Sequence, residues 1–278
     1  MNIGNHCVLY GGRLATEAKE ILGQLSQGGC DGVEIGKRFF GVENRGELLA
    51  VLQETGLNLG AYHVNSLLTD VLDNPERVRT MLLEAGKFLE VFPNRNIMYT
   101  LLPGGEMNTP ATWDSRLLNK EEVKKIAVFL DSVAEELQGK GVQLHLHNHN
   151  WEFMNGGLLF FTIADNAPHL NLGLDLGWVY AAGFDAIAVV RQYADRITYC
   201  HVRDLQFDKV GTYPDFQSVH DNLFVDLGEG DVPMNELLPL MRDTVGENGW
   251  LTIEYETGAQ DAVRYHQATA FIKRILNG

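Results

Sequence analysis

The chain has 278 residues, 45% of them hydrophobic, which is enough apolar material for one large core, so we expect a single domain over residues 1–278. Its 37 acidic residues outnumber its 22 basic residues, and the formal net charge of -15 argues against a nucleic acid partner, because phosphate binding needs clustered Lys and Arg. No run approaches the roughly 18–20 apolar residues of a membrane span, and no secretory leader pattern opens the chain, so we expect a cytoplasmic protein with a small-molecule partner.

Eight short apolar or alternating runs predict β-strands, and a segment with helical spacing follows each of them. The predicted strands cover residues 6–10, 32–35, 57–64, 96–101, 142–147, 170–176, 197–202 and 250–255. The predicted helices cover residues 16–27, 44–54, 75–91, 120–138, 159–166, 185–194, 234–245 and 261–276.

Strict alternation of strand and helix requires parallel strands joined by right-handed crossovers. Eight units in 278 residues predict a (β/α)8 TIM barrel with eight parallel strands, for which about 250 residues is typical; a doubly wound open sheet is the alternative. Two predicted connections are long, at 103–119 and 204–230. Loops of that length in a compact domain usually cover an active or binding site.

Four side chains that can bind a metal lie at or just past the ends of the last four predicted strands: Glu152, Asp175, His201 and Glu254. Barrel enzymes carry their chemistry at the C-terminal ends of the strands, so a barrel would bring these four residues to one centre. Three carboxylates and one imidazole form a mostly hard-oxygen set. We therefore predict one divalent ion, with Mn²⁺ or Mg²⁺ favoured and Co²⁺ or Zn²⁺ as alternatives.

Each candidate has a structural alternative. His145, His147 and His149 alternate with other residues and share one face of the fifth strand, where they are either functional groups or polar packing inside the barrel. Asp175 stands between leucines, where it either binds a partner or caps the next turn. His201 alone is typical of a core histidine and gains weight from the other candidates. The alternation also points Glu254 away from Ile253, toward the interior.

The motifs resemble a known family over essentially the whole chain. They are Gly28-Gly-Cys-Asp-Gly-Val-Glu-Ile, His147-Asn-His-Asn-Trp-Glu-Phe, Leu174-Asp-Leu-Gly, His201-Val-Arg-Asp, Leu227-Gly-Glu-Gly-Asp-Val and Ile253-Glu. In this order they resemble the xylose isomerase-like TIM-barrel superfamily. That superfamily includes hydroxypyruvate isomerase, ketose 3-epimerases, inosose-processing enzymes and, more distantly, endonuclease IV.

The resemblance implies metal ligands at Asp175, His201 and Glu254. On strand five it leaves two alternatives: Glu152, which we favour from the His-Asn-His-x-x-Glu-Phe pattern, and His147, which stands where many members have their glutamate. Trp178 replaces a histidine that the family often has. With Trp151 it would form either an apolar wall for a sugar ring or packing at the barrel rim.

The activity implied by the resemblance is that of a metal-dependent isomerase or epimerase acting on a keto sugar or related polyol. The ion would stabilise an enediolate, and Glu152 and Glu254 would exchange protons with the substrate as the catalytic acid/base pair. The expected substrate contacts are His63, His147, His149, Trp178 and Arg203, and the residues expected to orient the site from behind are Glu34 and Glu229. Asp204 is expected to anchor the strand-seven loop.

The main alternative is a dehydratase or other lyase acting on a keto-inositol or 3-keto sugar, because elimination begins with the same proton removal. An endonuclease IV-like enzyme is disfavoured, because this chain lacks the larger histidine set needed for three zinc ions and is strongly acidic. A sugar-binding barrel without activity is also disfavoured, because all four strand ends keep coordinating groups. The family resemblance is compatible with a homodimer or homotetramer.

Overall fold

The computed structural model describes residues 1–103, 115–213 and 215–278. Within that part of the chain, eight parallel strands close into a barrel in the order β1-β10-β7-β6-β5-β4-β3-β2. The strands are β1 (Asn2–His6), β2 (Gly32–Gly36), β3 (Asn58–Leu67), β4 (Asn96–Leu102), β5 (Gln143–His147), β6 (Asn171–Asp175), β7 (Ile197–Val202) and β10 (Trp250–Ile253). The predicted (β/α)8 barrel is therefore confirmed, and the open-sheet alternative is excluded by the closed order.

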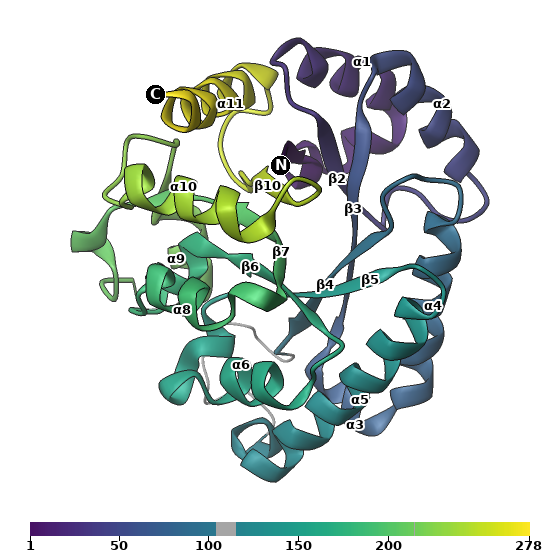
Figure 1. Ribbon diagram of the computed structural model, residues 1–278, viewed down its shortest axis with the longest axis vertical. Helices are drawn as coiled ribbons and strands as arrows, with labels where there is room; N and C mark the ends of the chain where they lie inside the picture. Colours follow the sequence, from purple (N-terminus) through teal and green to yellow (C-terminus); the bar gives the residue numbers. More distant parts are fainter. Residues whose placement is uncertain (104–114, 214) are drawn as a thin grey trace.

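Helices surround the strands, and the first and last of them, α1 and α11, pack against each other where the barrel closes (Figure 1). The helices of the repeating units are α1 (Leu14–Gln27), α2 (Arg45–Thr55), α4 (Pro75–Leu89), α5 (Lys120–Gln138), α6 (Met154–Asn166), α8 (Ala186–Gln192), α10 (Met234–Val245) and α11 (Ala262–Asn277). Short additional helices follow three strands: α3 (Leu68–Asp73), α7 (Leu176–Ala181) and α9 (Phe216–Asn222). None of the described helices is long and apolar enough to cross a membrane.

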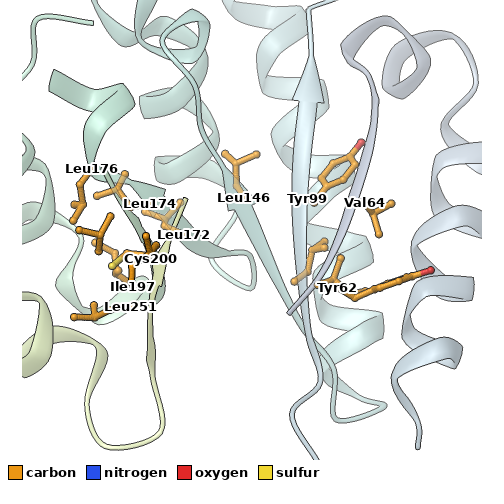
Figure 2. Close-up of a cluster of buried hydrophobic side chains, with 14 of the residues drawn as sticks. Tyr62, Val64, Tyr99, Leu146, Leu172, Leu174, Leu176, Ile197, Cys200 and Leu251 are labelled. Atoms are coloured by element: carbon orange, nitrogen blue, oxygen red, sulfur yellow. The ribbon is translucent and has the colours of Figure 1, made fainter. Parts of the chain in front are cut away.

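Alternation along the strands separates an apolar outer face from a polar inner face. Figure 2 shows outward-facing side chains from neighbouring strands, among them Tyr62, Leu146 and Leu174, gathered between the barrel and its helices. Tyr62, for example, stacks on Phe88 of α4 with their ring centroids 3.9 Å apart. Burial of this outer face against the helices supplies most of the apolar contact that holds the helices to the barrel.

A small apolar cluster of Ala61, Met98, Tyr199 and Trp250 packs inside the barrel, toward the N-terminal ends of the strands. Gly173 makes room for this packing, because a Cβ atom at that position would lie 2.3 Å from Met98 Sδ. Above the cluster, the inward-facing residues are polar. The inward-facing groups that can bind a ligand therefore lie toward the C-terminal ends of the strands.

One predicted strand was placed wrongly. Residues 6–10 do not form the first strand; β1 ends at His6, and Cys7–Arg13 forms a 3-10 helix that buries Cys7, Leu9 and Tyr10. The true strand was hidden because Ile3 is its one large apolar residue, which is too little to show an alternating pattern. Gly4 faces the side chains of Trp250 and Thr252, and a Cβ atom there would meet Thr252 Oγ1 at 2.9 Å.

The long connection after β7 is ordered by its own small sheet. In it, β8 (Asp204–Leu205) pairs with β9 (Phe224–Val225) in antiparallel fashion, and α9 lies between them. The Asp204 carboxylate accepts backbone N–H bonds from Leu205, Gly228, Gly230 and Val232 over 2.9 to 3.2 Å. These bonds agree with the predicted anchoring role of Asp204. Most of the other long connection, 103–119, lies outside the described residues.

Candidate metal centre and active site

The strand register brings the predicted ligands to one level of the barrel. Asp175 of β6 pairs in register with His201 of β7, and His201 pairs with Thr252, two residues before Glu254. On the other side, His6 of β1 pairs with Glu34 of β2. The C-terminal ends of neighbouring strands therefore present their polar side chains to one another inside the barrel mouth.

Four buried side chains offer ligand atoms that lie within 4.8 Å of one another: His147, Asp175, His201 and Glu254. His147 is fully buried, and neither of its ring nitrogens has a hydrogen-bond partner among the described residues. Burial lowers its pKa well below the usual value, so the imidazole is neutral and free to coordinate a cation. An unpartnered buried imidazole is costly unless something binds it.

The contact between His201 and Glu254 also fits coordination of one metal ion by both side chains. His201 Nδ1 lies 2.7 Å from Glu254 Oε2, yet neither atom takes part in a well-aligned hydrogen bond. Asp175 Oδ2 lies 4.0 Å from the same His201 nitrogen. Atoms that converge in this way without hydrogen bonding to each other are arranged as ligands around one cation would be. Two imidazoles and two carboxylates suit Mn²⁺, Co²⁺ or Zn²⁺ better than Mg²⁺.

Arg203, just past β7, is buried and neutralises the carboxylates of the site. Its Nε donates to Asp175 Oδ2 over 2.9 Å, and its Nη2 lies 2.9 Å from Glu254 Oε2 and 3.0 Å from Glu256 Oε2. Burial acts to raise the pKa of Glu254, but Arg203, His201 and His6 together hold it well below the usual value. Burial raises the pKa of Asp175 to about 7 against the effect of Arg203.

A second group, His6, Glu34 and His63, supports the first. Glu34 Oε2 accepts from His201 Nε2 over 2.8 Å, and Glu34 Oε1 lies 2.8 Å from His63 Nδ1. His6 Nδ1 lies 2.7 Å from Glu254 Oε1. Glu34 therefore lies behind His201, where it can orient the imidazole ring. His6 was not among the predicted site residues, because the predicted first strand begins at this residue, whereas β1 ends at it.

A cavity of about 670 Å³ opens directly onto this centre. Its wall includes His63, His147, His149 and Glu254, together with Trp151, whose ring stacks on His149 at a centroid distance of 4.1 Å. Burial lowers the pKa of His149 to about 3, so its imidazole is neutral. The volume suits a substrate of the size of a monosaccharide or cyclic polyol. Of the expected substrate contacts, His63, His147 and His149 thus line one cavity, whereas Arg203 does not line it and pairs with the neighbouring carboxylates instead.

Glu152 is not part of the converging group. It lies in the 3-10 turn Trp151–Phe153, fully buried, where one carboxyl oxygen accepts from the backbone N–H of His149 over 2.7 Å. Its other oxygen has no partner among the described residues, and it is absent from the cavity wall. Burial raises its pKa well above the usual value. The turn carries this residue away from the position that His147 fills, so the geometry corrects our preference on strand five.

Two other expected residues occupy different places. Trp178 is fully buried and does not line the cavity; its ring packs against Phe216 and Phe224, as in the rim-packing alternative. Glu229 is exposed and borders a separate cleft with Tyr255 on the outside of the barrel, so it does not support the site. Both were inferred from position in a motif, which does not fix the direction of a side chain.

Two further polar residues line the cavity without having been singled out from the sequence. Glu256 follows β10 and contacts Arg203, and His220 lies on α9 with its Nε2 atom 3.0 Å from Glu256 Oε2. Glu256 was detectable in principle, because it alternates with Glu254 on the same face. His220 belongs to the long connection after β7, where the sequence has no periodicity that indicates which side chains face the barrel.

The sequence profile of the xylose isomerase-like TIM barrel family matches residues 22–275. The inosose dehydratase of Clostridium perfringens is 26% identical over 159 residues, which are 55% of this chain and 53% of that relative. The matched segment thus spans about half the length of that relative.

Two solved structures have the same fold. D-psicose 3-epimerase of Clostridium cellulolyticum, solved with D-tagatose, superposes with a TM-score of 0.69 at 16% identity and covers 99% of both chains. The probable 3-DHS dehydratase of Bacillus anthracis, involved in petrobactin synthesis, has a TM-score of 0.70 at 14% identity, with 98% of this chain and 99% of that chain covered.

Proposed function

Because this chain belongs to the xylose isomerase-like TIM barrel family, we propose that it is a divalent-metal-dependent dehydratase acting on a polyhydroxylated ketone such as an inosose. The reaction removes the proton on the carbon next to the carbonyl and expels a hydroxyl from the following carbon as water. The observation that carries the choice of dehydration is the position of Glu152. Its carboxyl does not reach the cavity, so only one member of the expected acid/base pair, Glu254, faces a substrate.

The residues that would hold the ion are His147, Asp175, His201 and Glu254. The two unpartnered ring nitrogens of His147 support this assignment, because no described protein group satisfies them. A divalent ion bound there would polarise the substrate carbonyl and make the neighbouring proton easier to remove. Arg203 holds Asp175 in place through the bond from Nε. Glu34 fixes the ring of His201 from the opposite side.

Glu254 is the group best placed to take the proton. Its side chain reaches the cavity wall, and the cations around it keep it ionised. Oε1 is oriented by His6 and Oε2 by Arg203, so the carboxylate does not need to reorganise before it acts. Trp151 and Phe216 on the same wall limit the access of water to the reacting carbon.

Isomerisation or epimerisation is the second candidate, favoured by the likeness of the fold to D-psicose 3-epimerase. Epimerisation inverts a carbon centre and so needs a base that takes the proton on one face of the substrate and an acid that returns a proton on the other. Glu152 would have to turn out of its buried turn to supply the second face. A shift of the carbonyl between adjacent carbons needs only one base, and Glu254 would serve for it.

The test uses Mn²⁺-reloaded protein with an inosose and, separately, with D-psicose. We expect loss of water from the inosose, followed by NMR, and no epimerisation of D-psicose. Glu254→Gln should lower the dehydration rate by about 100-fold or more while the protein stays folded by circular dichroism. Epimerisation of the ketose without dehydration of the inosose would overturn the proposal in favour of the second candidate.

A further inference from the structure

His220 is a titratable side chain in the cavity that the reaction described above does not use. It lies on α9, and its side chain is about 20% exposed. It borders the same cavity as Glu254, although it comes from the long connection after β7 rather than from a strand end. A substrate that fills the cavity would therefore meet the Glu254 carboxylate and the His220 ring together.

Two carboxylates hold the two ring nitrogens of His220. Nδ1 lies 2.8 Å from Asp221 Oδ1, and Nε2 lies 3.0 Å from Glu256 Oε2. An ionised carboxylate can only accept, while a neutral imidazole has one N–H group. With Nδ1–H donating to Asp221, a second carboxylate 3.0 Å from Nε2 is favourable when that nitrogen carries a proton as well. The geometry thus favours the imidazolium form.

The charged groups that face His220 come from three elements: Asp221 on α9 itself, Glu256 after β10 and Arg203 after β7. Glu256 makes the largest contribution, and Asp221 adds to it, while burial and the Arg203 charge act in the opposite direction. The result raises the pKa of His220 to about 9. The cavity thus contains the Glu254 carboxyl group and, at neutral pH, a protonated histidine, which together offer the base and the acid that an elimination needs.

The position of His220 is fixed by the packing of α9. Phe216, at the first turn of the helix, stacks on Trp178 with ring centroids 5.3 Å apart and lies 4.9 Å from Trp151. Asp215 caps the helix by accepting from Ser218 N–H over 2.8 Å. The buried Trp178, which contacts no substrate cavity, therefore supports the helix that carries His220.

We propose that His220 is the proton donor to the departing hydroxyl group of the substrate, an inference that rests on the proposed dehydratase function. In the reaction, the C–H bond next to the carbonyl breaks and its proton passes to Glu254. The electron pair forms the new C=C bond, the C–O bond on the next carbon breaks, and the hydroxyl leaves as water with the Nε2 proton of His220, which turns from Glu256 to the leaving oxygen. Afterwards Glu254 returns its proton to solvent and His220 regains one, so no oxidant or reductant is required.

The first test does not depend on activity. Histidine side-chain NMR of the full chain, with His220→Gln used to assign the signal, should give a titration midpoint for His220 near pH 9. Glu256→Gln should lower that midpoint, because it removes the carboxylate at Nε2. A midpoint below about pH 7 would overturn the inference, since the ring would then be neutral in the working enzyme.

The second test separates the two proton transfers. Mn²⁺-reloaded protein is incubated with an inosose in D₂O, and NMR follows both deuterium uptake at the carbon next to the carbonyl and formation of the dehydrated product. For His220→Gln we expect deuterium uptake to persist within about threefold while elimination falls by about 100-fold. Glu254→Gln should lose both. The matched control is His169→Gln, because His169 also pairs with a carboxylate, Asp131, but lies outside the cavity.

Each outcome has a separate meaning. Elimination that persists in His220→Gln overturns the role of His220 and leaves the dehydratase proposal intact. An equal fall of both rates also overturns that role, because it would indicate that His220 holds the cavity together rather than donating a proton. Deuterium uptake by the wild type without any dehydrated product overturns the proposed function itself, and the step assigned to His220 with it.

Discussion

Arg203 and Asp175 form a fully buried ion pair at the mouth of the barrel, with Nε 2.9 Å from Oδ2. The same guanidinium also neutralises Glu254 and Glu256. Two neighbouring strand ends, β6 and β7, and the end of β10 are therefore joined through one side chain. Removing it would leave several carboxylates buried close to one another without a counter-charge.

Arg203→Met should therefore destabilise the metal-free protein by about 3–5 kcal/mol, the usual cost of leaving one member of a buried pair unpaired. Urea unfolding in the presence of a chelator measures this change. The control is Arg191→Met, whose partner Glu236 is more than half exposed, as is Arg191 itself; it should cost about 1 kcal/mol or less. Similar losses in the two variants would contradict the role given to Arg203.

Metal binding distinguishes the two residues that the sequence left open on strand five. His147→Gln and Asp175→Asn should weaken Mn²⁺ binding by about 100-fold or more, because each removes a donor atom from the converging group. Glu152→Gln should keep the ion, because its carboxyl faces the backbone of His149 instead. Elemental mass spectrometry after reloading gives the metal content of each variant. Loss of the ion in Glu152→Gln with retention in His147→Gln would restore Glu152 as the ligand.

The sequence predicted the barrel because strand–helix alternation is repeated along the whole chain, and it placed β7, α5 and α10 at their observed bounds. It also predicted that Asp175, His201 and Glu254 would meet, because each lies at a strand end whose register follows from the fold. Residues beyond a strand end were harder to place. The short turn that contains Glu152 decides the direction of its carboxyl, and α9, which carries His220, depends on tertiary packing rather than on local pattern.

Glu152 should make stability depend on pH. Burial raises its pKa in the folded protein, whereas the unfolded chain ionises near pH 4.3. Folding therefore takes up a proton between these two values, and stability falls as the pH rises through that window. Glu152→Gln removes the penalty, so its Tm should exceed that of the wild type at pH 8, with a difference that shrinks toward pH 5.

Thermal unfolding of the metal-free proteins across this pH range tests the prediction. Glu135→Gln, an exposed change on α5, serves as the control and should give a difference in Tm that stays constant with pH. A Glu152→Gln variant that is less stable than the wild type at pH 8 would mean that the carboxylate is ionised and partnered in the folded protein.

Asp204 should control the mobility of the long connection after β7, which carries α9. The two carboxyl oxygens of Asp204 accept from four backbone N–H groups, those of Leu205, Gly228, Gly230 and Val232. These bonds tie the start of the connection to its end. Asp204→Ala leaves these donors without their acceptor, and we expect local opening to become easier by about 1–2 kcal/mol. Hydrogen exchange of the amides between residues 224 and 232 should accelerate by about 5–30-fold.

The matched control is Asp208→Ala, an exposed change within the same connection that removes the same charge. Hydrogen exchange in this variant should match the wild type. If Asp204 acts through the position of α9, Asp204→Ala should also slow dehydration of the inosose, because Phe216 and His220 would no longer be held against the cavity. Faster exchange that is spread evenly over the barrel strands would instead mean that the carboxylate stabilises the whole fold.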